Sequence, residues 1–146
     1  MAEAQGLYRG YVENRIDPMN LGRVQVRVPS LYGAVESDEK VSTASLPWAV
    51  PGSLNCASNK AGQFLIPPVG SIVWVMFEDA DPRKPVYFGG VFTTAEGDNP
   101  VSPIMSSPSQ YVVFKTPDEE GYITYDTKEG VMTIKYYRNL RNHFQQ

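Results

Sequence analysis

The segment at residues 71–78 reads SIVWVMFE and is apolar at every position from 72 to 77. Its β-branched and aromatic residues predict a strand, and both faces of that strand are apolar. A strand without a polar face must be covered on both sides. A chain of 146 residues can cover one side with its own core, and we expect another subunit to cover the other. This strand therefore indicates a component of an assembly.

A second strand is expected at residues 22–28, where GRVQVRV places a valine at every second position. This period of two predicts a half-buried strand whose arginines and glutamine face water. Asp17 and Pro18 suit the first positions of a type I turn before the strand. Pro29 ends the strand because it has no N–H to donate.

The first two-thirds of the chain are expected to contain short strands and many turns. The whole chain has twelve glycines and twelve prolines, which favour turns. About five bent strands predict an all-β fold, a five-stranded OB-type Greek-key barrel. We place this barrel at residues 1–93. The two strands described above, at residues 22–28 and Ser71–Glu78, belong to it. Its other strands are expected at Leu7–Asn14, Leu46–Val50, Gln63–Ile66 and Pro85–Phe92.

A change of composition follows the barrel. Residues 94–110 are rich in proline and serine and predict an extended linker. Residues 111–146 are expected to form a short β meander extension with a polar tail, and its strands are Tyr111–Thr116, Gly121–Thr127 and Val131–Tyr137. A lone three-stranded sheet is marginal in water, so its apolar face must pack on the barrel or on copies of itself. That face carries Ile123, Tyr125, Met132, Ile134 and Tyr136.

Catalytic and metal-binding chemistry have little support in this sequence. His143 is the single histidine and lies in the polar tail, and Cys56 is the single cysteine. A single cysteine fits a reducing compartment. His143 and Cys56 together do not have the spacing of zinc ligands. We therefore expect no enzyme activity, no metal and no cofactor. The start of the chain shows no secretory signal, and the net charge of −3 argues against nucleic acid as a partner.

An OB module that binds single-stranded nucleic acid or a glycan is the alternative. Such barrels combine a basic groove with stacking aromatic residues, and here the candidates lie on or between the first two expected strands. Trp48 and Trp74 could also form a carbohydrate platform, although core or interface packing is the favoured interpretation. The groove residues would be Arg9, Arg15, Arg23, Arg27, Tyr8 and Tyr11.

Several motifs in register between residues 8 and 92 resemble the OB-fold domain of phage baseplate hub and spike proteins. This family includes baseplate assembly protein V and the valine–glycine-repeat spikes of type VI secretion. The stretches that carry the resemblance include GYVEN at 10–14, LPW at 46–48 and PVYFGG at 85–90. The residues of its turns and corners are Asp17, Pro18, Gly22, Arg23, Pro67, Pro68, Gly70, Asp81, Pro82, Gly89 and Gly90.

The resemblance implies a structural baseplate hub–spike adaptor in the virion, assembled in the host cytoplasm. Its expected partners are two further copies in an axial homotrimer, a baseplate hub protein, and a separate spike or tip protein through which alone the host envelope is contacted. Tail-tube or tape-measure components are further candidates. The residues expected to contact the oligomer or hub are Trp48, Val73, Trp74, Val75, Phe77, Tyr87, Ile123, Tyr125, Met132, Ile134 and Tyr136.

Overall fold

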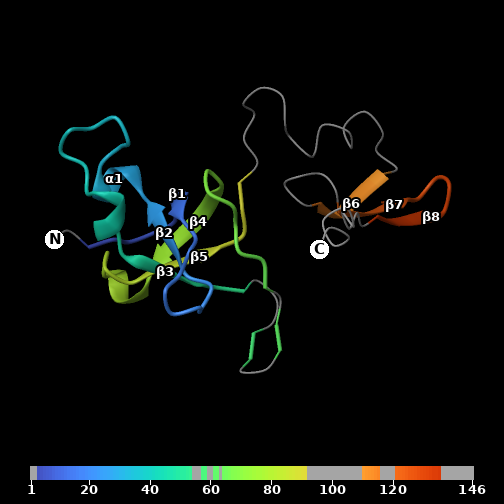
Figure 1. The fold of residues 1–146 in the computed structure, drawn as a ribbon, viewed down its shortest axis with the longest axis horizontal. Coiled ribbons are helices and arrows are strands. Elements are labelled where there is room, and N and C mark those ends of the chain that lie inside the picture. Colours follow the sequence, from blue (N-terminus) through green and yellow to red (C-terminus); the bar gives the residue numbers. More distant parts are fainter. Residues whose placement is uncertain are drawn as a thin grey trace, which may run out of the picture. The chain divides into compact units, whose positions relative to one another are not determined.

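The computed structural model describes residues 3–53, 57–58, 61–62, 64–91, 110–115 and 121–135. The chain divides into two compact units, Met1–Phe92 and Thr93–Gln146, and each is considered by itself. The first unit is a closed barrel and the second contains a three-stranded sheet (Figure 1). The predicted all-β, OB-type architecture is confirmed.

The barrel closes in the order β1-β2-β3-β5-β4. The pairs are antiparallel except for β3 with β5, which is parallel. Full closure leaves no strand edge open to solvent, which is how such small barrels avoid edge pairing. The five strands are β1 (Tyr8–Asn14), β2 (Val24–Arg27), β3 (Trp48–Pro51), β4 (Ile72–Phe77) and β5 (Pro85–Phe88).

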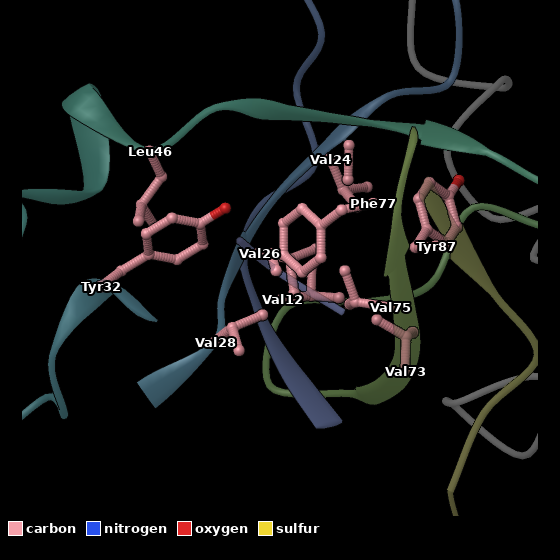
Figure 2. Packing of buried hydrophobic residues seen from close by; sticks show 12 residues of the cluster. Val12, Val24, Val26, Val28, Tyr32, Leu46, Val73, Val75, Phe77 and Tyr87 are labelled. Carbon is pink, nitrogen blue, oxygen red and sulfur yellow. The ribbon is translucent and has the colours of Figure 1, made fainter. Parts of the chain in front are cut away.

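Small branched side chains fill the barrel interior. Figure 2 shows valines of three strands turned toward the ring of Phe77. Tyr8 closes one side of this ring with an edge-on contact of 5.4 Å between ring centres. The buried valines are Val12 of β1, Val24 and Val26 of β2, Val28 just after β2, and Val73 and Val75 of β4.

Gly10 lies where β1 passes closest to the opposite interior side chains. A Cβ at this position would stand 2.2 Å from Cγ1 of Val26 and 2.8 Å from Cγ2 of Val75. Both distances are far below ordinary contact, and both neighbours are packed core residues. Only a residue without a side chain fits here.

The connection between β2 and β3 covers the outer side of β2. It contains the short helix α1 (Pro29–Tyr32) and the 3-10 turn η1 (Thr43–Ser45). Gln25 of β2 donates to the carbonyl of Leu46 at 2.9 Å, and Tyr32 donates its hydroxyl to the carbonyl of Pro82 at 2.6 Å. Burial raises the pKa of Tyr32 to about 12, and the charge of Asp81 adds to this rise.

Arg27 is the centre of this cover and is only 1% exposed. Its guanidinium makes a bidentate ion pair with Glu13 of β1 and donates to the carbonyls of Tyr32 and Gly33 at 3.2 Å and of Val41 at 2.8 Å. The register between Val12 and Asn14 is irregular, so Glu13 sits at a bulge. The expectation that β2 has a wet face is therefore wrong, because both of its faces are buried.

Residues 64–71 lead into β4 without forming a strand, so the strand expected at Gln63–Ile66 is not present over its described residues 64–66. Gly70, in the left-handed region at φ 88°, donates its N–H to the carbonyl of Val12 at 2.9 Å. This turn brings the chain back to pair β4 with β1. After β4 comes the short 3-10 turn η2 (Glu78–Ala80).

The second unit is a meander of β6 (Gln110–Lys115), β7 (Tyr122–Asp126) and β8 (Val131–Lys135). Ile123 pairs with Ile134 and Tyr125 with Met132, so these four side chains share one face of the sheet. Its strands correspond to the three expected. Gln110, assigned to the linker at residues 94–110, is the first residue of β6, and the rest of the linker and the tail after residue 135 lie outside the described residues.

We predict that Gly10→Ala destabilises the barrel, because the new methyl group would overlap Val26 and Val75. Overpacking of this kind costs about 1–3 kcal/mol of unfolding free energy. Urea denaturation followed by tryptophan fluorescence measures the loss. Gly90→Ala is the matched control, since a Cβ there would meet nothing closer than 3.7 Å. Equal midpoints for the two variants would contradict the close approach at Gly10.

Arg27→Met is expected to lower the unfolding free energy by about 3 kcal/mol. The methionine keeps the apolar stem but removes every donor, so Glu13 and the carbonyls of Tyr32, Gly33 and Val41 each lose the charged hydrogen-bond donor that Arg27 supplies. Urea denaturation again measures the effect, with the exposed Arg15→Met as control. The cover is not held by Arg27 if the two substitutions cost the same.

The Arg27 guanidinium, chiefly through its hydrogen bonds, holds the pKa of Glu13 below its ordinary value of 4.5. A lowered folded-state pKa stabilises the protein fully above the ordinary pKa, and this stabilisation is lost as pH falls through the folded value. We therefore expect Glu13→Gln to lower stability at pH 7 and to flatten the decline between pH 5 and 3. Urea midpoints at a series of pH values test this, and an unchanged slope would refute it.

Candidate interaction surfaces

The outer side of β4 and β5 is apolar and only partly covered. Trp74 pairs with Phe88, and Met76 pairs with Val86, so the side chains of the two strands lie next to each other outside the barrel. Arg9 of β1 lies over the ring of Trp74 at 5.6 Å. We call this set the outer apolar face, and it consists of Val50, Ile72, Trp74, Met76, Val86 and Phe88.

Contiguous exposed apolar residues of this kind mark sites of protein contact. Met76 and Val50 are nearly half exposed, and Trp74 and Phe88 are half-buried. The inward side of residues 72–77 is covered by the barrel interior, as the sequence predicts for one face of this strand. On the other side, the described part of the chain leaves it open.

Four of the residues expected at an interface lie in the barrel interior instead. Val73, Val75 and Phe77 alternate inward along β4, and Tyr87 alternates inward along β5. The Tyr87 hydroxyl donates to the carbonyl of Gly22 at 2.7 Å, and burial raises the pKa of Tyr87 while the charge of Arg15 opposes this rise. These four side chains pack in the interior beneath the outer side of β4 and β5, so they are not exposed to a partner. Trp48 is half-buried and has the guanidinium of Arg23 over its ring at 5.4 Å.

The sheet of the second unit has one strongly apolar face. Met132 is 61% and Ile134 70% exposed, and Tyr125 and Phe114 are each about two-fifths exposed. Ile123 is half-buried on the same face. Tyr136, which we expected to extend this face, lies outside the described residues. We call these residues the sheet face, and they are Phe114, Ile123, Tyr125, Met132 and Ile134.

The β1–β2 loop is held by Asp17. Its buried carboxylate accepts the backbone N–H groups of Met19 and Leu21 at 2.9 Å and of Arg23 at 3.2 Å, and it makes a bidentate pair with the Arg23 side chain. The Arg23 guanidinium and these N–H groups hold the pKa of Asp17 well below its usual range. Gly22 follows in the left-handed region at φ 73°. Asp17 and Gly22 therefore have the structural roles that a turn motif predicts.

The other turn residues also support the barrel. The Arg83 side chain and backbone N–H bind Asp81 and lower the pKa of Asp81 to about 2. Pro82 is buried and accepts the Tyr32 hydroxyl. Beyond these residues, Pro67 and Pro68 are half-buried in the corner before β4, Pro18 is exposed in the β1–β2 loop, and Gly89 and Gly90 follow β5 at the surface.

The basic groove required by a nucleic-acid or glycan site is not assembled. Arg27 is buried beneath the β2–β3 connection, and Arg23 is engaged by Asp17. Arg9 and Arg15 are left exposed, and Tyr8 is turned onto Phe77. The connection between β2 and β3 also occupies the outer side of β2, where OB barrels commonly bind such ligands. The structure therefore opposes this alternative.

The described residues contain no cluster of three or more His, Cys, Asp or Glu able to hold a metal ion. No helix among them is long and apolar enough to cross a membrane. His143 and Cys56 lie outside the described residues. The surfaces that remain are suited to protein contact.

Exposed apolar residues near the β1–β2 loop were not predicted from the sequence. Ile16 is 81% and Phe64 71% exposed, and Met19, Leu21 and Leu65 are more than half exposed. The signal was present, since isoleucine, methionine and leucine are unusual in a turn rich in Asp, Pro, Asn and Gly. A turn motif by itself does not indicate whether the apolar residues within it are exposed.

The comparisons with known proteins agree with this geometry. A family model described as the type VI secretion system/phage-baseplate injector OB domain matches residues 8–92, which is more than half of the chain and spans all five barrel strands. No curated protein matches the chain. The chain therefore belongs to the family of the type VI secretion system/phage-baseplate injector OB domain, and its role is a structural one in a baseplate or a related spike.

Proposed function

We propose that this chain is a structural hub–spike adaptor on the axis of a contractile tail or injection machine. Three copies surround the axis and join a ring-shaped hub at the tube end to a separate membrane-piercing spike or tip. Contraction of the sheath then drives these parts forward as one body, and this chain breaks no bond. The family membership supports the baseplate setting of this proposal.

The observation that carries the trimer is the sheet face. A three-stranded sheet with one apolar face needs a second layer to be stable. Fully burying a side chain such as Ile134 or Met132 contributes about 1.5–3 kcal/mol. Ile134 pairs with Ile123 and Met132 with Tyr125, so the apolar residues form one continuous strip. Packing three such strips around an axis buries all of them at once.

The outer apolar face supplies a second contact, for the hub. Trp74 and Phe88 are large, rigid and half-buried, which is the character of residues that dominate protein interfaces. The barrel beneath them is closed and well packed, so they are held in fixed positions. Tail-tube or tape-measure components approach the same end of the assembly. Assembly takes place in the host cytoplasm, and the envelope is contacted only through the spike.

We predict that the purified full chain sediments at three times the monomer mass at micromolar concentration. The double substitution Ile134→Ala with Met132→Ala should raise the dissociation constant at least about tenfold, since each 1.4 kcal/mol of lost burial is a factor of ten. Sedimentation equilibrium measures both quantities.

Thr133→Ala is the matched control, because Thr133 lies between these residues on the opposite face of β8. A trimer that tolerates the double substitution as well as the control would exclude the sheet face as its interface. A chain that stays monomeric throughout the concentration range would contradict a trimer that forms without the hub.

A further inference from the structure

The β1–β2 loop is held in one conformation while its apolar side chains face water. Three backbone N–H groups, those of Met19, Leu21 and Arg23, converge on the carboxylate of Asp17 at 2.9, 2.9 and 3.2 Å. Met19 and Leu21 are nevertheless more than half exposed. A loop needed only to reverse the chain gains nothing from displaying such residues, and displaying them has a hydration cost. Rigid display of this kind is typical of a contact surface that loses little entropy on binding.

A second segment extends the same surface. The ring of Phe64 lies over Gly22, with Cε1 3.0 Å and Ile66 Cγ1 3.8 Å from the position a Cβ of Gly22 would take. The segment before β4 and the β1–β2 loop are therefore in contact, at the end of the barrel where β1 ends and β4 begins (Figure 1). We call the combined exposed residues the loop-end surface, and they are Ile16, Met19, Leu21, Phe64, Leu65 and Ile66.

The segments that form this surface have a net positive charge, because Arg23 is neutralised by Asp17 and Arg15 is the remaining charge. Within residues 14–23 and 64–71 the single carboxylate is Asp17, which is buried and paired with Arg23. Arg15 is exposed, and its charge opposes the rise in the pKa of Tyr87, whose hydroxyl is bonded to Gly22. The chain as a whole has a net charge of −3, so this cationic, apolar surface differs from the rest of the chain.

The charge decides which occupant fits. If two copies met through this surface about a twofold axis, each would bring the same Arg15 charge and no free carboxylate to the interface, and like charges at an interface are unfavourable. An acidic rim on a different protein would instead complement Arg15 while an apolar pocket received Met19 and Phe64. Complementary charge of this kind also speeds association and suppresses wrong partners.

We propose that the loop-end surface docks a different protein, through an apolar pocket rimmed by Asp or Glu on that protein. This docking rests on the proposed function only in requiring that the barrel be part of an assembly. It is separate from the sheet face, which we assign to contacts between copies, and from the outer apolar face on β4 and β5.

The test is photo-crosslinking of the full chain in cells that assemble the injector particles. The photoreactive residue p-benzoylphenylalanine replaces Met19, and mass spectrometry identifies the crosslinked peptide. We expect a peptide from a different protein that contains apolar residues next to Asp or Glu. Adding Arg15→Glu should lower the crosslink yield about fivefold, which corresponds to about 1 kcal/mol. Arg83→Glu, a charge reversal in the exposed turn between η2 and β5, should leave the yield unchanged.

Apolar specificity is tested with a matched pair of variants. Leu21 is 52% and Val35 53% exposed, and Val35 lies in the β2–β3 connection away from the loop-end surface. Leu21→Ser should reduce the Met19 crosslink, and Val35→Ser should not. Equal yields from the two variants, a crosslink to another copy of this chain or to lipid, or no crosslink at all would each overturn the docking proposal.

A second probe at Met132 separates this proposal from the trimer. Crosslinks between copies from Met132 without any product from Met19 would leave the trimer standing and remove the docking surface. A crosslink from Met19 to an acidic protein, together with a monomeric chain and no product from Met132, would do the reverse.

Discussion

The buried guanidinium of Arg27 determines which sides of the barrel are open. It joins β2 to Glu13 of β1 and to three carbonyls of the β2–β3 connection, so it orders a segment that has little regular structure of its own. A buried charge is tolerable only when its hydrogen bonds are satisfied, and here each bond also fixes a piece of backbone. The connection can lie over β2 because Arg27 is there to bind it. The side of the barrel that often binds ligands in OB folds is thereby filled by the chain itself.

Covering β2 leaves the contacts of this protein to other surfaces. The interior valines and Phe77 make a barrel too tightly packed to deform, as the close approach at Gly10 indicates. On such a support, Trp74 and Phe88 are presented outward from β4 and β5 in fixed register. A structural part that transmits force needs this combination of a rigid body and several separate apolar contacts. An OB module for nucleic acid would instead need free cations, and Arg23 and Arg27 are both committed within the chain.

The barrel could be predicted because its signals are local. Alternating valines, a turn motif with Asp17 and Gly22, and the apolar run at 72–77 each indicate a strand or turn by themselves. The burial of Arg27 could not be predicted, because the period of two assigns Arg27 to the solvent-exposed face of the strand. Arg27 is buried because residues 29–46 cover that face, and their path cannot be read from the sequence pattern. The same reasoning placed Val73, Val75, Phe77 and Tyr87 at an interface, since an apolar strand does not reveal which of its faces is the interior. The sequence predicts a strand at Gln63–Ile66, but the described residues 64–66 form none. The ring of Phe64 lies over Gly22 instead, a contact that the sequence does not reveal.

The exposed surfaces differ in charge, and in our proposals this difference separates contacts between copies from contacts with other proteins. Ile123, Tyr125, Met132 and Ile134 carry no charge, so identical copies can bring these residues together without repulsion. The loop-end surface places Arg15 beside its apolar residues and has its one carboxylate buried, so identical copies repel each other there. An assembly with a symmetric core and different neighbours along its axis needs both kinds of surface, because a single uncharged apolar face would also accept wrong partners. The Asp17–Arg23 pair thus has two consequences. It fixes the shape of the β1–β2 loop, and because its two charges cancel, Arg15 alone sets the charge of the loop-end surface.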